Sequence, residues 1–301
     1  MAATEAAVEA TSNTTATMQD NGFLLVDSEN NIQEFMVFME EQQGRLCNDK
    51  PTTCVLDIEG VDLGRDGTIE VVSFGVKDHY DTNHIWLLDA QHMETTGTLE
   101  AFKSFVEHPN VVTIIHDCRQ DCDALLHKWN IDIAKVHDTS AFHSVLTGSS
   151  RNTNLNDTLL ANGIAINTAR IIVDYRNNHD YWARRPFTQG MLDHASGDIT
   201  KLFDLYDRQI EKASHKGLFD NAMKKSNTFK LQLSDMHTTW LQCKIPMCRF
   251  IGRGGSGINS ASERSKCCFY GRGDARKRSS GFLVYYPDNA SLQIAKRYLG
   301  Y

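Results

Sequence analysis

The sequence has no stretch approaching the roughly 18 consecutive apolar residues that a membrane-spanning helix needs. Its first twenty residues contain acids but no basic n-region and no long apolar stretch, unlike a secretory signal or an Arg-rich transit peptide. We therefore expect residues 1–21 to form a disordered tail. The eight cysteines include no Cys-x-x-Cys pair and no Cys/His group with zinc-ligand spacing. These absences predict an intracellular protein of the cytoplasm or nucleus, with reduced thiols and no membrane segment.

The sequence does contain enough apolar residues to build cores, 41% of its 301 residues. Its charge is divided unevenly along the chain. Residues 229–301 hold 12 Lys and Arg against 4 Asp and Glu, a net charge of +8, so the chain total of −7 leaves −15 for residues 1–228. Such an asymmetry indicates that the C-terminal part meets a polyanion.

Apolar patterns predict the order of the elements. A helical stripe covers residues 31–45, and the strand-like runs TTCVLDIE, TIEVVSFGV and NHIWLLDA follow it. Next come a helix over 99–107, the strand VVTIIH and a further helix, and the rest to about residue 215 is predicted to be mainly helical. This order favours an α/β or α+β domain with a mixed sheet covered by helices. The polar residues 213–230 are predicted to be a linker to a small second domain.

Asp57 and Glu59 stand two residues apart at the end of the run CVLDIEG. Strand residues two apart point to the same side of a sheet, and two adjacent carboxylates repel unless cations lie between them. Solvated acids at the mouth of a strand are the ordinary alternative. Asp121 follows VVTIIH at the start of a helix, where open α/β sheets place their ligands, and Asp198 lies one helical turn after His194. Each of these also has a simple explanation as a solvated helix residue.

Together, VLDIEG, IIHDCRQDCDALL and WARRPFTQGMLDHASGDITKLFDLY resemble the three motifs of the DEDD superfamily of 3′-to-5′ exonucleases. The resemblance is closest to the ribonuclease D-like branch and defines an exonuclease domain over residues 22–212. It implies a ribonuclease H-like mixed sheet with flanking helices, and two Mg²⁺ or Mn²⁺ ions that clamp the attacking and leaving oxygens. Asp57 would bridge both ions, Glu59 and Asp198 would complete one site, and Asp121 would hold the other. The product would be a 5′-mononucleotide.

Some positions in these motifs leave alternatives open. His194 occupies the spacing at which ribonuclease D-like members have a tyrosine that orients the water, and a neutral imidazole could act there as general base. Asp117 and Asp123 are rivals to Asp121, which is favoured by its five-residue spacing from a histidine. The motif III segment also contains residues outside the acid set. Trp182 is predicted to be a core residue, whereas Arg184 and Arg185 could contact phosphates or be structural.

The basic C-terminal part contains the loop IGRGGSGI. Its Gly-x-Gly-x-x-Gly lacks the long βαβ unit of a dinucleotide-binding domain, and no Lys-Ser/Thr of a Walker A loop follows it. The pattern resembles instead a KH domain, a small α+β module whose Gly-x-x-Gly loop clamps single-stranded nucleic acid. Residues 231–301 would form this module, and its loop would be Gly252, Arg253, Gly254 and Gly255.

Both resemblances together are similar to plant-type exonuclease/KH proteins. They predict a metal-dependent 3′-to-5′ exonuclease whose substrate is single-stranded RNA, with DNA left open. The alternative is a catalytically silent RNA-binding adaptor that uses both domains as binding surfaces.

Overall fold

The computed structural model describes residues 22–46, 51–78, 80–149, 153–242, 249–251 and 283–285, with side chains through Leu233. The chain forms two compact units that divide between Gln232 and Leu233. In the second unit, β7 (Arg249–Ile251) pairs antiparallel with β8 (Leu283–Tyr285). The expected tail over 1–21 and the expected nucleic-acid-binding loop, Gly252 to Gly255, lie outside the described residues.

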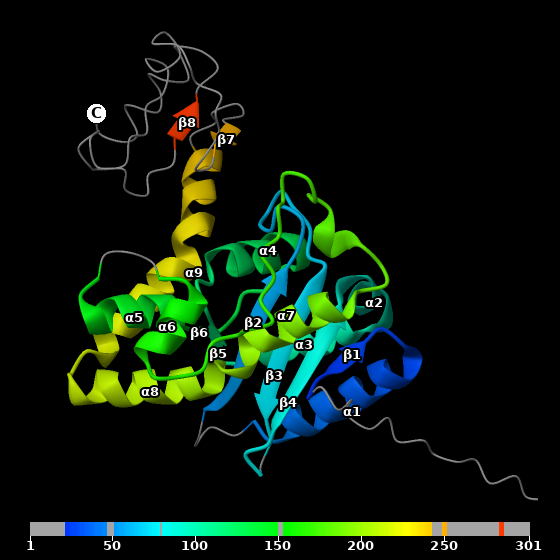
Figure 1. The fold of residues 1–301 in the computed structure, drawn as a ribbon, viewed down its shortest axis with the longest axis horizontal. Coiled ribbons are helices and arrows are strands. Elements are labelled where there is room, and N and C mark those ends of the chain that lie inside the picture. Colours follow the sequence, from blue (N-terminus) through cyan, green and yellow to red (C-terminus); the bar gives the residue numbers. More distant parts are fainter. Residues whose placement is uncertain are drawn as a thin grey trace, which may run out of the picture. The chain divides into compact units, whose positions relative to one another are not determined.

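A six-stranded mixed sheet forms the centre of the first unit (Figure 1). Its strands follow the order β1-β4-β3-β2-β5-β6. Only the β2–β3 and β3–β4 pairs are antiparallel among these strands. The strands are β1 (Leu24–Val26), β2 (Thr52–Glu59), β3 (Val71–Lys77), β4 (Asn83–Asp89), β5 (Val111–Ile115) and β6 (Lys135–Asp138). The predicted mixed sheet is confirmed.

Helices cover both faces of the sheet. They are α1 (Glu29–Gly44), α2 (Ala90–Thr96), α3 (Thr98–Val106), α4 (Arg119–Trp129), α5 (Thr139–Thr147), α6 (Leu155–Ala161), η1 (Tyr181–Ala183), α7 (Gln189–Thr200), α8 (Leu202–His215) and α9 (Phe219–Gln242). On one face, Phe74 of β3 packs edge-on against Phe35 of α1 and Phe102 of α3. On the other face, α7 crosses β2, β3 and β4, and its Ala195 and Ile199 join Val55 in the second core cluster. The alternation of side chains along β2 therefore feeds two separate cores.

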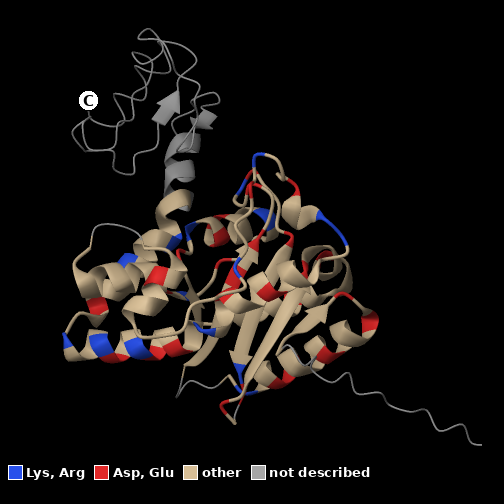
Figure 2. Cartoon of the chain, in the orientation of Figure 1, with Lys and Arg blue, Asp and Glu red and all other residues tan. Residues whose placement is uncertain are grey.

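Two parts of the predicted organisation need correction. Residues 213–230 are not a linker, because α8 and α9 cover most of them and Ala213, Ala222 and Phe229 are buried. Most of their polar residues are exposed, although Ser226 is buried. Figure 2 shows the mixed charges along α8, whose last residues belong to this range. The region up to residue 215 is also less helical than predicted. It contains the short strand β6, and residues 163–180 hold no helix or strand.

Candidate metal and nuclease site

The first two acids come from the central strand β2. Asp57 and Glu59 share the face of Val55, which is fully buried, while the intervening Ile58 points into the opposite core. β2 pairs with β5 over its first half and with β3 from Cys54 to Glu59, so the backbone that carries the two acids is held by β3. The two half-buried carboxylates therefore project together at the carboxyl end of the strand, as the spacing predicted. Figure 2 shows acidic residues at this end of β2.

Asp121 reaches the same point from α4. Its Oδ1 accepts a hydrogen bond from the backbone N–H of Ile58, at 3.1 Å, so its side chain lies directly against β2. His116, five residues earlier, points elsewhere: its Nδ1 lies 2.8 Å from the Thr139 hydroxyl and its Nε2 3.0 Å from the Thr153 carbonyl.

The two rival acids are engaged by other partners. Asp117 has a positive φ of 63° and forms a two-bond ion pair with Arg119, at 2.5 Å for each bond. Asp123 is buried and accepts from the backbone and guanidinium of Arg65, in the loop after β2. Of the three motif II candidates, Asp121 is the one in contact with the strand that carries Asp57.

Helix α7 contributes His194 and Asp198, and its N-terminus is capped by the Thr188 hydroxyl, which accepts from the Met191 N–H. Both residues are almost fully buried, and their one-turn spacing aligns them on one side of the helix. His194 Nε2 lies 3.4 Å from Asp198 Oδ2 and 3.9 Å from Glu59 Oε1. The structure thus brings all five predicted site residues together from β2, α4 and α7.

The 163–180 segment, which precedes η1, adds residues that the sequence did not reveal. Asn167 donates to Asp198 Oδ1 at 2.8 Å and to the His194 carbonyl at 3.2 Å. Arg170 places Nη1 3.5 Å from Asp198 Oδ2. The Ile171 N–H donates to His194 Nδ1 at 3.3 Å. No periodicity marks this segment, so its residues could be assigned to the site only from the fold.

Hydrogen bonding determines how the His194 ring can act. Since Nδ1 accepts from Ile171, a neutral ring carries its proton on Nε2, which faces the carboxylates. Nε2 forms no hydrogen bond of good geometry, so its contact with Asp198 is electrostatic. In this arrangement neither nitrogen offers a free lone pair to a water molecule. This arrangement favours a role in holding Asp198 over the general-base role considered from the sequence.

The pKa values of the four acids are shifted in different directions by their surroundings. Burial, together with the charges of Glu59, Asp121 and Asp198, raises the pKa of Asp57 well above its usual range. Burial and the charge of Asp198 raise the pKa of Glu59 to about 8. The pKa of Asp121 is raised to about 7, chiefly by burial. Burial also disfavours the Asp198 anion, but His194, Arg170 and Asn167 outweigh that effect and lower its pKa.

These side chains fit hard divalent cations. Burial and neighbouring carboxylates raise the pKa values of Asp57, Glu59 and Asp121, and bound cations would relieve both effects. Oxygen ligands of this kind are the ones that Mg²⁺ and Mn²⁺ prefer. Ligand atoms of Glu59, His194 and Asp198 all lie within 4.8 Å of one another. His194 fits less well as a ligand, because its Nε2 lone pair would require a proton on Nδ1, facing the Ile171 N–H.

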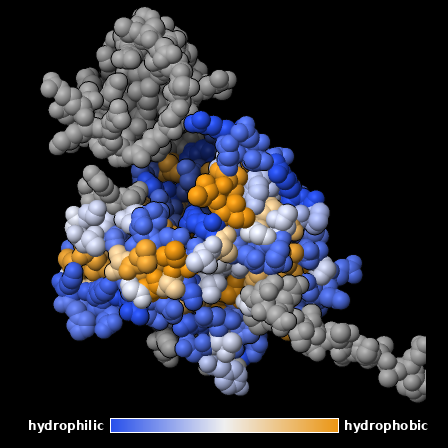
Figure 3. Space-filling model, in the orientation of Figure 1, coloured by the Kyte–Doolittle hydropathy of each residue, from blue (hydrophilic) through white to orange (hydrophobic). Residues whose placement is uncertain are grey.

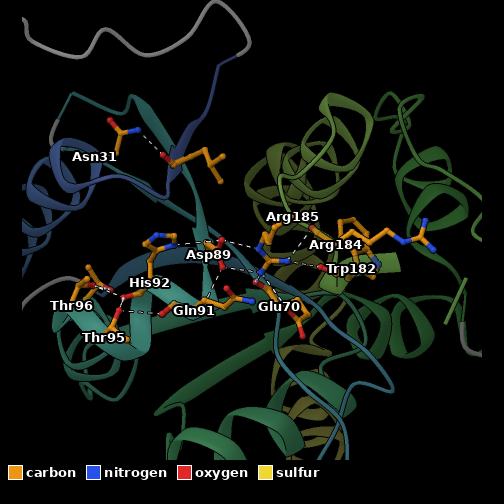
Figure 4. Close-up of polar contacts among 12 residues, drawn as sticks. Asn31, Glu70, Asp89, Gln91, His92, Thr95, Thr96, Trp182, Arg184 and Arg185 are labelled. Carbon is orange, nitrogen blue, oxygen red and sulfur yellow. Dashed lines mark hydrogen bonds and ion pairs between the residues drawn. The ribbon is translucent and has the colours of Figure 1, made fainter. Parts of the chain in front are cut away.

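The Trp182-Ala183-Arg184-Arg185 element is largely structural. Trp182 is 1% exposed, as expected of a core residue, and its ring packs edge-on against His194. Arg185 makes two 2.9 Å bonds to Asp89 and further bonds to Glu70 (Figure 4). It therefore ties this element to the ends of β3 and β4. Arg184 points away from that network and pairs with Asp180 at the surface.

The comparisons with known proteins agree with this geometry. A family model described as 3′-5′ exonuclease matches residues 36–213, more than half of the chain. The chain therefore belongs to the 3′-5′ exonuclease family. Ribonuclease D of Shewanella sp. (strain ANA-3) is 23% identical over 180 residues, which cover 56% of this chain and 42% of that protein.

Solved structures show the same fold at low identity. The catalytic core of RRP6 from Trypanosoma brucei is 16% identical, with a TM-score of 0.53 over 69% of this chain and 52% of that one. Trypanosoma brucei RNase D in complex with RNA U12 is 17% identical, with a TM-score of 0.50 over 62% and 63%. Brucella melitensis NrnC with bound Mg²⁺ is 16% identical, with a TM-score of 0.50 over 66% and 92%. The chain spans about half the length of the first relatives it matches.

Within the residues that the structure describes, no helix is long and apolar enough to cross a membrane.

Proposed function

We propose that this protein is a divalent-metal-dependent 3′-to-5′ exonuclease that removes 5′-mononucleotides from single-stranded RNA. The observation that carries the proposal is the convergence of four carboxyl groups from three distant segments on one point of the sheet. Four clustered acids can bind divalent cations for catalysis. Membership of the 3′-5′ exonuclease family indicates that the reaction is hydrolysis of a phosphodiester bond. The Ribonuclease D relative and the RNA-bound neighbour favour RNA as the substrate class.

In this proposal the four acids would hold two Mg²⁺ or Mn²⁺ ions. Asp57 would be shared by both ions, Glu59 and Asp198 would serve one, and Asp121 would serve the other. The cations would supply Lewis-acid activation of the attacking water and stabilise the leaving 3′ oxygen. His194 is a positioning residue that faces Asp198 through Nε2 and is itself held by Ile171. Its work is to keep the Asp198 carboxylate in place and charged.

The test is a degradation assay on RNA labelled at either end, with Mg²⁺ or Mn²⁺. Wild type should shorten 5′-labelled RNA stepwise and release a labelled mononucleotide at once from 3′-labelled RNA. Asp57→Asn should lose nearly all of this activity. Asp193→Asn is a matched control on α7, since Asp193 bonds Gln189 rather than the acids. Tight RNA binding without stepwise shortening from the 3′ end would show instead a catalytically silent RNA-binding adaptor. Full activity in Asp57→Asn would refute the metal assignment.

The basic residues 231–301 are proposed to form a KH module that captures the single strand through Gly252, Arg253, Gly254 and Gly255. Small loop residues let phosphates approach the backbone N–H groups, and binding should weaken steeply with salt. Replacing Gly254 and Gly255 with Asp should therefore weaken binding of a long RNA more than hydrolysis of a dinucleotide. Equal losses on both substrates would contradict this division of labour.

A further inference from the structure

The 163–180 segment is attached firmly to the acid site although it has no regular structure. Asn156 of α6 pairs with the backbone of Asn167 on both sides, at 3.0 Å and 3.3 Å. The Asn167 side chain in turn bonds α7 through Asp198 and the His194 carbonyl. These contacts fix the backbone just before Arg170. The position of that arginine beside the acids is therefore built into the fold.

Arg170 forms an ion pair with the acid site although its side chain is partly exposed. Its guanidinium contacts Asp198, and its positive charge also opposes the raised pKa values of Asp57 and Glu59. Yet its side chain is 43% exposed, whereas that of Asp198 is 4% exposed. An arginine held on one side only, on a long and flexible stem, can leave a carboxylate when a better cation arrives.

Charge balance indicates where the guanidinium would go. Two divalent cations carry four positive charges, which match the four carboxylates of the cluster. Arg170 then leaves one positive charge in excess beside the site. A phosphodiester group carries one negative charge, and its oxygens match the fork of a guanidinium. The positive and negative charges of the site are therefore equal when one phosphate of the substrate binds beside Arg170.

The same segment also exposes apolar surface next to Arg170. Ile172 is 98% exposed and Tyr175 is 50% exposed, and Figure 3 shows hydrophobic surface among hydrophilic residues in this part of the molecule. The charge of Glu59 adds to burial in raising the pKa of Tyr175, which indicates that the phenol lies within electrostatic range of the acids. A nucleotide offers a charged phosphate and an apolar base, and the segment presents a group for each.

We propose that Arg170 stands in for a cation in the metal-free site and that, once two cations are bound, it contacts the phosphate of the 3′-terminal nucleotide. The second half rests on the proposed exonuclease function, whereas the first half concerns metal binding alone.

The first half is tested by titrating Mn²⁺ into the full-length protein by calorimetry, without RNA. Arg170→Gln should bind Mn²⁺ about threefold to tenfold more tightly than wild type, because a competing cation has been removed. Arg170→Lys, which keeps the charge, should stay closer to wild type. Arg176→Gln is the matched control, because it removes an arginine that is exposed on the same segment. Unchanged or weaker Mn²⁺ binding in Arg170→Gln, or no Mn²⁺ binding by any of the proteins, overturns the proposal.

The second half is tested on single-stranded RNA. Arg170→Gln should raise KM roughly tenfold, the effect of one charge-assisted contact, and Arg176→Gln should leave KM within about twofold. Equal KM changes in the two variants, or none in Arg170→Gln, overturn the phosphate contact. If wild type degrades no RNA, the proposed function fails. RNA affinity measured by fluorescence anisotropy with Ca²⁺ then decides the contact: tenfold weaker binding by Arg170→Gln supports it, and equal binding refutes it.

Discussion

Glu59 should destabilise the metal-free protein at neutral and alkaline pH, so Glu59→Gln should stabilise it. The Glu59 side chain lies at the end of β2 and is 16% exposed. Burial, and then the charge of Asp198, raise its pKa from 4.5 to about 8. A carboxyl group with a raised pKa in the folded state binds its proton more tightly there than in the unfolded chain. Its favourable contribution is present below pH 4.5 and is lost as the pH rises to about 8.

The size of the effect follows from that interval. At about 1.4 kcal/mol for each pH unit, a rise from 4.5 to about 8 corresponds to a ceiling of roughly 5 kcal/mol. Because neighbouring acids share protons and the site relaxes, roughly 2 to 3 kcal/mol is a realistic expectation. The neutral amide of Gln avoids this cost. It should therefore raise the free energy of unfolding by that amount at pH 8, and by far less at pH 5.

The assay is urea denaturation in EDTA at pH 5 and pH 8, repeated with Mg²⁺. Wild type should lose stability between the two pH values in EDTA and regain much of it with Mg²⁺ at pH 8, because bound cations stabilise the folded state. Glu59→Gln should lose less and regain less. Asp193→Asn on α7 should follow wild type. A Glu59→Gln protein that is no more stable than wild type at pH 8 in EDTA would refute the electrostatic reasoning.

Two further predictions separate structural residues from functional ones. Arg185→Met should lower the free energy of unfolding by about 3 kcal/mol, because buried Asp89 loses both guanidinium bonds and keeps only the Gln91 N–H and the His92 contact, whereas Arg184→Met should change it by about 0.5 kcal/mol or less. Equal urea midpoints for the two variants would contradict the structural role of Arg185. Asp121→Asn should weaken Mn²⁺ binding by about tenfold or more without lowering the free energy of unfolding, while Asp123→Asn should lose about 1 to 3 kcal/mol of stability and keep Mn²⁺ affinity. The reverse pattern by calorimetry and denaturation would move the motif II ligand to Asp123.

The sequence predicted the parts of the fold that have long, regular patterns. The central strands β2, β3, β4 and β5 were evident as apolar runs, and α1 was evident from its periodic stripe. The two strands at the sheet edges, β1 and β6, were missed. They have three and four residues, and β6 is the polar stretch KVHD, so neither shows a periodicity that can be detected.

For the site, the motif resemblance grouped four acids that the structure places near one another, but only one spacing favoured Asp121 over its neighbours. Asp117, Asp121 and Asp123 differ in the structure through backbone geometry and arginine partners, which no linear pattern displays. Arg170 was missed for the same reason. Its segment is irregular, and its approach to Asp198 depends on a side-chain bond from Asn167 that only the folded chain creates.

The contrast between Asp198 and the other acids indicates how the site is prepared for cations. His194, Arg170 and Asn167 all favour the Asp198 anion, whereas burial and mutual repulsion favour protons on Asp57 and Glu59. At neutral pH Asp198 is therefore ionised, whereas Asp57 and Glu59 would have to lose protons before they bind a cation. The affinity for divalent cations should therefore rise with pH. His194 helps to keep Asp198 ionised because the Ile171 N–H binds Nδ1 and leaves Nε2 facing the carboxylate. With its ring committed to Asp198, His194 would leave activation of the attacking water to the cations in the proposed mechanism, so a histidine at the tyrosine spacing is compatible with turnover without acting as a base.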